Sequence, residues 1–338
     1  MIDGAMQEFA LTLDKFLDHA AKWFPRAEVV TARESGRIDR IGYADLRVRS
    51  LKVSAMLRDF GIGVGDRVAT LAWNTQAHVE TWFGIFGIGA TCHTLNPRLT
   101  AAQTAAMLVR SECRTIVVSA DLAQLAHEIV QLAPAVERVL IIDGTVDVWP
   151  GGHERPAVIA LEGAISEARA PLEWGGFDER TACGLCFTSG TTGAPKGVTY
   201  THRSSYLHAL RLLQADSIGI TAVDSVLAVV PMFHANAWGL PFATPAAGAK
   251  LVLPGRHVDG ASLARLIAAE SVTIAVGVPT VMDLGGAAWE NERIPAGMVL
   301  TPRDIDAKIK QLGRWIGIGI DLALHEGLDA ETAAGFLS

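Results

Sequence analysis

Short runs of apolar, often β-branched residues alternate along the chain with longer stretches whose apolar residues recur at helical spacing. Strands and helices that alternate in this way are typical of a layered α/β fold, because the helices can cover the faces of the sheets. The predicted strands are residues 66–73, 114–119, 138–143, 183–188, 198–201, 225–230, 250–253 and 272–276. The predicted helices are residues 75–87, 100–111, 121–132, 202–214 and 260–270. Thr100 is a suitable N-cap for its helix, since its hydroxyl can accept a bond from a free backbone N–H.

Two stretches depart from this alternation. Residues 144–176 are richer in Gly, Pro and Glu, and we expect a connector there. From residue 283 the alternation of strands and helices ends, and a loop-like stretch is followed by predicted helices at 301–312 and 321–337. We therefore expect an α/β domain of layered mixed sheets with flanking helices at 1–282 and an atypical tail at 283–338.

Composition excludes several classes of protein. The net charge is −7 and no basic block is present, so nucleic-acid binding is not expected. The N-terminus lacks a basic segment followed by a long apolar one, and we predict no signal peptide. The longest uncharged stretch, 226–249, contains three prolines and is predicted to be buried in a soluble fold rather than to span a membrane. A cytoplasmic protein is expected.

The four cysteines are too few for a disulfide scaffold in a chain of 338 residues. Cys183 and Cys186 have the spacing of a redox or metal site. They lie in an apolar run without a second cysteine pair, so we expect them to be ordinary core residues.

A loop rich in glycine and hydroxyl groups follows the predicted strand at 183–188. Its sequence, Phe-Thr-Ser-Gly-Thr-Thr-Gly-Ala-Pro-Lys-Gly at 187–197, combines backbone freedom, many donors and one cation. Such a loop suits a triphosphate, although it lacks the Gly-Lys-Ser/Thr order of a Walker A loop. The predicted nucleotide-binding residues are Thr188, Ser189, Gly190, Thr191, Thr192, Gly193 and Lys196.

Five segments resemble one family. Residues 187–197 are similar to the signature loop of the adenylate-forming superfamily, which includes acyl-CoA synthetases. Residues 230–239, Val-Pro-Met-Phe-His-Ala-Asn-Ala-Trp-Gly, resemble its acyl and adenylate pocket, and 277–280, Gly-Val-Pro-Thr, resemble a strand end beside it. Residues 95–99 and 43–46 favour the fatty-acyl or medium-chain acyl-CoA synthetase branch.

The resemblance implies a reaction in two steps. A carboxylic acid with a medium or long acyl chain attacks ATP to give an acyl-adenylate and pyrophosphate, and coenzyme A then forms a thioester. ATP and Mg2+ are the implied cofactors. Lys196 and His234 are the implied catalytic residues, and His234, Trp238, Gly277 and Pro279 the implied substrate contacts. The residues alone leave open whether His234 is a core histidine and whether Trp238 belongs to the core or to a pocket wall.

The chain also departs from the family pattern. It contains no Tyr-Gly-x-Thr-Glu sequence, no Thr-Gly-Asp sequence and no match to the family's C-terminal lysine segment. We therefore expect an incomplete, truncated N-terminal domain of an acyl-CoA synthetase. The alternatives are a non-catalytic remnant that binds phosphates or a partner, and one half of a split enzyme that needs a complementing chain. A homo-oligomer is a further open possibility. Asn96 and Arg98 are expected to fix a turn, and His202 and Arg203 to have a structural role as caps of the next helix.

Overall fold

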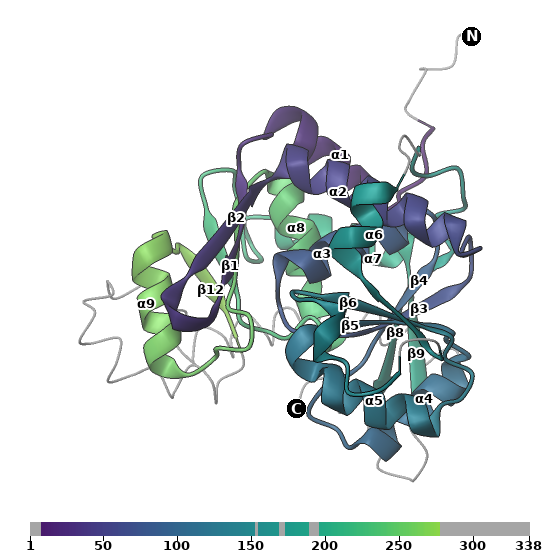
Figure 1. Cartoon of the computed structure of the whole chain (residues 1–338). Helices are drawn as coiled ribbons and strands as arrows, with labels where there is room; N and C mark the ends of the chain where they lie inside the picture. The colour runs from purple at the N-terminus through teal and green to yellow at the C-terminus, as the bar shows by residue number, and fades with distance from the viewer. Residues whose placement is uncertain (1–7, 153–154, 169–172, 189–195, 278–338) are drawn as a thin grey trace, which may run out of the picture.

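The computed structural model describes residues 8–152, 155–168, 173–188 and 196–277 (Figure 1). The predicted tail at 283–338 lies outside these residues, as do Ser189, Gly190, Thr191, Thr192, Gly193 and Pro279. Within the described ranges the chain forms two sheets with helices around and between them, as predicted for a layered α/β fold.

The larger sheet has seven strands in the order β7-β6-β5-β3-β4-β8-β9. Its strands are β3 (Arg67–Leu71), β4 (Thr91–Thr94), β5 (Thr115–Ser119), β6 (Arg138–Ile142), β7 (Ala157–Ala160), β8 (Ala182–Thr188) and β9 (Lys196–Thr201). All neighbours are parallel except β8 and β9, which are antiparallel. The carboxyl ends of β3, β4 and β8 therefore meet at one edge.

The smaller sheet has five strands in the order β12-β10-β11-β1-β2. Its strands are β1 (Glu28–Ala32), β2 (Ile38–Gly42), β10 (Ser225–Ala228), β11 (Lys250–Leu253) and β12 (Ile274–Val276). Only β1 and β2 are antiparallel. In this sheet β1 of the N-terminal hairpin pairs with β11, and paired residues such as Val29 and Leu251 are 222 positions apart, so the sheet forms only when distant segments meet.

Nine α-helices lie within the described residues. They are α1 (Asp14–Trp23), α2 (Tyr43–Asp59), α3 (Gln76–Gly87), α4 (Ala101–Ser111), α5 (Ala123–Leu132), α6 (Leu161–Glu167), α7 (His202–Leu212), α8 (Leu240–Ala247) and α9 (Gly260–Glu270). Short 3₁₀ turns span Glu34–Gly36, Ala120–Leu122, Val146–Val148 and Ala235–Gly239. Figure 1 shows α4 and α5 on one face of the larger sheet, α3 and α6 on the other, and α9 beside the smaller sheet.

Side-chain alternation explains these layers. Ile116 and Val118 of β5 pack in the cluster under α4 and α5, whereas Val117 faces the cluster that contains α3. Successive strand residues point to opposite faces, so both faces of this sheet must be apolar. Helix α3 is buried along its whole length, which suits its place between the two sheets.

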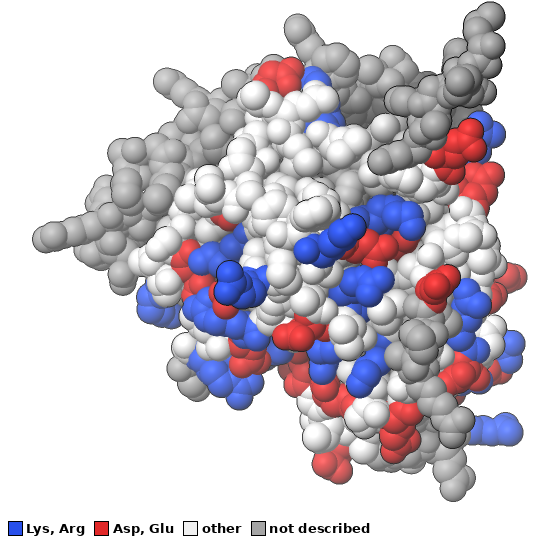
Figure 2. Space-filling model, turned by 90° about the horizontal axis from the view of Figure 1, so that it is seen from above, with Lys and Arg blue, Asp and Glu red and all other residues white. Residues whose placement is uncertain are grey.

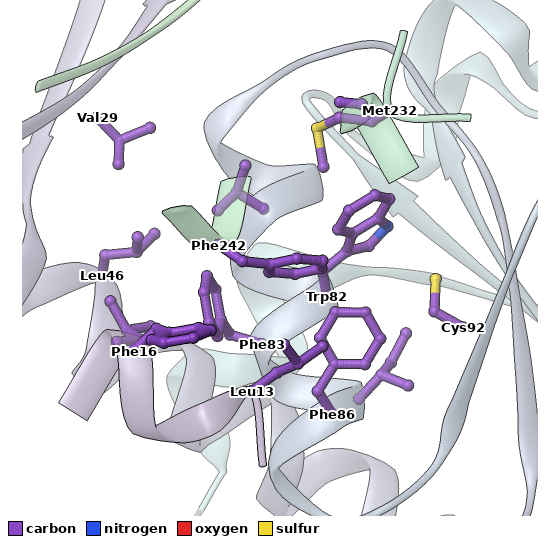
Figure 3. Packing of buried hydrophobic residues seen from close by; sticks show 14 of the residues in the cluster. Leu13, Phe16, Val29, Leu46, Trp82, Phe83, Phe86, Cys92, Met232 and Phe242 are labelled. Atoms are coloured by element: carbon purple, nitrogen blue, oxygen red, sulfur yellow. The ribbon is translucent and has the colours of Figure 1, made fainter. Parts of the chain in front are cut away.

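Aromatic rings join α3 to α8. Trp82, Phe83 and Phe86 surround Phe242 with ring centroids 5.7, 6.2 and 5.6 Å apart (Figure 3). Tilted and edge-on ring pairs at such distances stabilise a core beyond the area that they bury. This cluster holds the helix that follows residues 230–239.

Within the described residues the predicted strands and helices are present, with a few differences; those predicted at 301–312 and 321–337 lie outside them. Thr100 caps α4 in a capping box with Gln103, as its hydroxyl predicts. Strand β10 ends at Ala228, two residues earlier than expected, because Pro231 and the turn after it leave the sheet. The predicted connector at 144–176 contains strand β7 and helix α6, whose pairing with β6 and packing on α2 are long-range contacts. The tertiary contacts thus order a segment of weak local pattern.

The cysteines are core residues, as predicted. Cys92, Cys113, Cys183 and Cys186 are all buried and unpaired by disulfides. Burial raises the pKa of Cys183 to about 12, so its thiol stays protonated. Within the described ranges no helix is long and apolar enough to cross a membrane. Figure 2 shows Lys and Arg interspersed with Asp and Glu over the face in view. Ion pairs link several charged side chains of the described residues, among them Arg114 with Glu137.

Candidate functional site

Residues 230–239 leave the smaller sheet at the end of β10. The backbone N–H groups of Val229 and Val230 both donate to the Val276 carbonyl of β12, at 2.9 and 3.0 Å. Gly277 is buried and follows Val276 directly, so it lies beside the start of this segment. Two segments matched to the same predicted pocket are therefore adjacent, although almost 50 residues separate them in sequence.

A left-handed turn follows His234. The φ angle is 44° at Ala235, 52° at Asn236, 48° at Ala237, 51° at Trp238 and 75° at Gly239. Each non-glycine residue in this conformation costs about 1–2 kcal/mol. A turn of this kind persists only where surrounding contacts determine it, and such strain clusters at functional sites.

Two contacts hold the turn in place. The carbonyl of Trp238 is 3.0 Å from Nε2 of the partly buried His208 on α7. The Cys186 thiol of β8 donates to the side-chain oxygen of Asn236 at 3.8 Å. A Cβ atom at Gly184 of β8 would lie only 2.8 Å from Nδ2 of Asn236, so glycine is needed for this close approach. The turn thus packs on the strand that leads into the predicted nucleotide loop.

His234 lies at the start of the turn, and its side chain is exposed. This exposure is inconsistent with the interpretation as a core histidine. Partial desolvation of the ring lowers its pKa below the ordinary value, so the imidazole is mainly neutral at pH 7. A neutral imidazole can donate or accept a hydrogen bond at a substrate carboxyl group without carrying a charge.

Trp238 is half-buried and packs against the main core. Its left-handed backbone is fixed through its own carbonyl, as described above. The side chain therefore has one part in the core and one part open to the surface, and its place in a pocket wall stays a prediction.

The predicted nucleotide loop is closed by a hairpin. In the antiparallel β8–β9 pair Thr188 is opposite Lys196, so the two ends of the loop meet. Lys196 is exposed at the first position of β9. An exposed ammonium group at the base of this hairpin is free to approach an anion from the solvent.

Arg98 has a second role that sequence reasoning missed. Asn96 accepts a bond from the Arg98 backbone N–H at 2.9 Å, which confirms the predicted turn. The Arg98 guanidinium lies 5.9 Å from the ring centroid of Phe233, and Trp73 meets the same ring edge-on at 6.3 Å. The one feature of the sequence that could have indicated this contact is the position of Arg98 just after β4, because the carboxyl ends of parallel strands lie at the same edge of a sheet.

His202 and Arg203 have structural contacts, but the expectation that they cap the helix is wrong. His202 is buried at the start of α7, and its Nδ1 accepts from the Leu13 backbone N–H at 3.2 Å. Arg203 pairs with Glu179. Thr201, rather than either residue, caps the helix.

The described residues contain no group of three His, Cys, Asp or Glu side chains that could hold a metal ion. A Mg2+ ion that accompanies a nucleotide commonly keeps several waters and binds the phosphates with few protein ligands.

Comparison with known proteins identifies this arrangement. The sequence profile of the family described as AMP-binding enzyme matches residues 17–298. A medium-chain-fatty-acid–CoA ligase from Ectopseudomonas oleovorans is 38% identical over 82% of this chain and 50% of its own length. A long-chain-fatty-acid–CoA ligase from Thermus thermophilus is 38% identical over 92% of this chain and 57% of its own length.

The fold has a solved counterpart. The crystal structure of a long-chain-fatty-acid-CoA ligase from Archaeoglobus fulgidus superposes with a TM-score of 0.72 at 23% identity. It covers 86% of this chain, and this chain covers 56% of it. This chain spans about half the length of the curated relatives that it matches. The resemblance read from the motifs is confirmed, and the chain belongs to the AMP-binding enzyme family.

Proposed function

We propose that this chain is a fatty acid–CoA ligase-type protein that activates a medium- or long-chain carboxylic acid with ATP. In the first step a carboxylate oxygen bonds to the α-phosphorus while the bond to the pyrophosphate oxygen breaks. The products are an acyl-adenylate and pyrophosphate. In the second step the sulfur of coenzyme A bonds to the acyl carbon, and AMP leaves.

The observation that carries the proposal is the convergence of the motifs. The β8–β9 hairpin at the base of the glycine loop, the 230–239 turn and Gly277 are separate in sequence and adjacent in the fold. This arrangement brings the strand that leads into the glycine loop next to the segment that carries the neutral imidazole, which supports a shared site for phosphate and acid. The likeness to two fatty-acid–CoA ligases supports the same acid class.

Each residue has a proposed task. Thr188, Ser189, Thr191 and Thr192 donate to phosphate oxygens, and Gly190 and Gly193 let the backbone approach them. Lys196 stabilises the charge that develops on the departing pyrophosphate. His234 donates to the acid's carboxyl group, while Trp238, Gly277 and Pro279 form the acyl pocket. Mg2+ bound to ATP would neutralise further phosphate charge.

The test is ATP–pyrophosphate exchange by the purified chain with octanoate and with palmitate. We expect Lys196→Ala to lower the exchange rate by about 10²-fold, the typical effect of removing one charge-stabilising donor. Lys52→Ala, on α2 and outside the site, is the matched control and should leave the rate unchanged. Equal rates for both variants would contradict the role of Lys196.

The departures from the family pattern support a second candidate, a chain that binds phosphates but cannot complete adenylation alone. Nucleotide binding measured by calorimetry, without any exchange, would favour this candidate. Exchange that appears only on addition of a second chain with the Tyr-Gly-x-Thr-Glu and Thr-Gly-Asp sequences would favour a split enzyme. Exchange by this chain alone would refute both alternatives.

A further inference from the structure

Asn74 makes three hydrogen bonds to the backbone just before the left-handed turn. Its Nδ2 donates to the carbonyls of Ala228 and Val230, both at 2.9 Å. Its Oδ1 accepts from the Met232 N–H at 2.7 Å. The side chain is 4% exposed. All its amide donors and one acceptor position are thus directed to a single five-residue stretch, about 155 residues away in sequence.

These backbone groups need such a partner. Strand β10 ends at Ala228, and the Val229 and Val230 N–H groups reach across to β12. Pro231 has no N–H, so the ladder cannot continue through it. Val230 and Met232 are fully buried, and a buried backbone group without a partner is costly. The primary amide of Asn74 takes the place of the missing strand neighbour.

Asn74 is itself firmly held between the two sheets. It lies just after β3 of the larger sheet, and its carbonyl accepts from the Gly255 N–H, just after β11 of the smaller one, at 3.0 Å. The next turn is tied to β1, because the Gln76 N–H donates to the Thr31 hydroxyl at 2.8 Å. The amide therefore has a fixed origin from which to set the position of residues 230–232.

A ligand-binding role for this amide is not supported. The hollow that Asn74 lines has a volume of about 20 Å³, room for roughly one water molecule. Its three polar contacts are all to backbone. The amide of Asn74 therefore binds the backbone of this chain rather than a ligand.

We propose that Asn74 is a positioning residue that sets the place of His234 and of the turn through Trp238 by fixing the backbone from Ala228 to Met232. Its last contact, the Met232 N–H, lies two positions before His234. The consequence for catalysis rests on the proposed function, whereas the conformational claim does not.

The test uses hydrogen–deuterium exchange in the whole chain. Asn74→Asp keeps the shape and the acceptor but removes both donors, so the peptide spanning 229–240 should exchange about tenfold faster or more. Peptides from β5 and β6 should be unchanged. Asn96→Asp, also an asparagine after a strand of the larger sheet but not bonded to this segment, is the matched control.

A second variant guards against misfolding. Asn74→Ala leaves space in which water can replace the amide, and it should raise exchange in 229–240 by a smaller factor with the same localisation. A uniform rise over the whole fold, or no change at 229–240 in either variant, would overturn the proposal.

A kinetic measurement tests the part of the proposal that depends on the proposed function. If the wild-type chain shows ATP–pyrophosphate exchange, Asn74→Ala should raise the KM for the acid about tenfold while that for ATP changes little. Equal changes in both constants would contradict positioning at the acid end. If the wild-type chain shows no ATP–pyrophosphate exchange, only the proposed function is contradicted. The proposal for Asn74 is still tested by hydrogen–deuterium exchange, which does not depend on catalysis.

Discussion

Gly184 of β8 offers a sharp test of how the left-handed turn is held. A Cβ atom at this position would lie 2.8 Å from Nδ2 of Asn236, well inside the optimum of about 3.5–4.0 Å for such contacts. Elsewhere in a strand, replacing Gly by Ala stabilises by roughly 0.5–1 kcal/mol, because Gly loses more backbone entropy on folding. Overpacking at a rigid contact costs about 1–3 kcal/mol. The clash should win, so we expect Gly184→Ala to lower the free energy of unfolding by about 1–2 kcal/mol.

The effect of Gly184→Ala on the free energy of unfolding should change sign when the Asn236 side chain is removed. Asn236→Gly deletes the side chain that clashes and also suits the left-handed φ of 52°. In this background Gly184→Ala should be neutral or stabilising by up to about 1 kcal/mol. Urea unfolding of the four proteins in the cycle, followed by far-UV circular dichroism, measures the coupling between the two sites.

A control separates the clash from a general effect of the substitution. Gly163 on α6 has nothing within 4 Å of its ideal Cβ position, so Gly163→Ala should stabilise. If Gly184→Ala were equally destabilising with and without the Asn236 side chain, the proposed contact would not be what holds the turn on β8.

Two further predictions concern stability. Burial lowers the pKa of His78 to about 4 and the pKa values of His93 and His202 to about 3. At these three histidines the unfolded chain therefore takes up protons below about pH 6.5 while the folded chain does not, so their contribution to stability should fall below that pH. Urea midpoints from pH 7.5 to 5 measure this, and a His93→Gln variant should lose less stability over this range than the wild-type chain; an equal loss in both would contradict the neutral buried state of His93. The buried Tyr43 hydroxyl donates to the Ala249 carbonyl at 2.7 Å, so Tyr43→Phe should cost about 1–2 kcal/mol in thermal or urea unfolding, and a cost near zero would mean that this bond contributes nothing net.

The sequence alone predicts the elements whose signals are local. Thr75 and Thr100 start their helices as hydroxyl caps, and α9 begins and ends where its apolar spacing predicts. The buried strands of the larger sheet follow from runs such as that of β5, because a parallel sheet covered on both faces needs continuous apolar residues. The glycine loop and the 230–239 segment are also local patterns, and they are enough to recognise the family.

The tertiary structure decided what depends on contacts between distant residues. Nothing in the sequence near Asn74 indicates that its amide completes the backbone of residues 228–232, since the partners are about 155 positions away. The left-handed turn at Ala235–Gly239 opposes local preference and exists because His208, Gly184 and Cys186 converge on it. Segment 144–176 lacks a clear period, yet it forms β7 and α6 where an open sheet edge and α2 provide partners. Local propensity is worth only tenths of a kcal/mol to about 1 kcal/mol per residue, and packing between segments that meet only in the folded chain exceeds it.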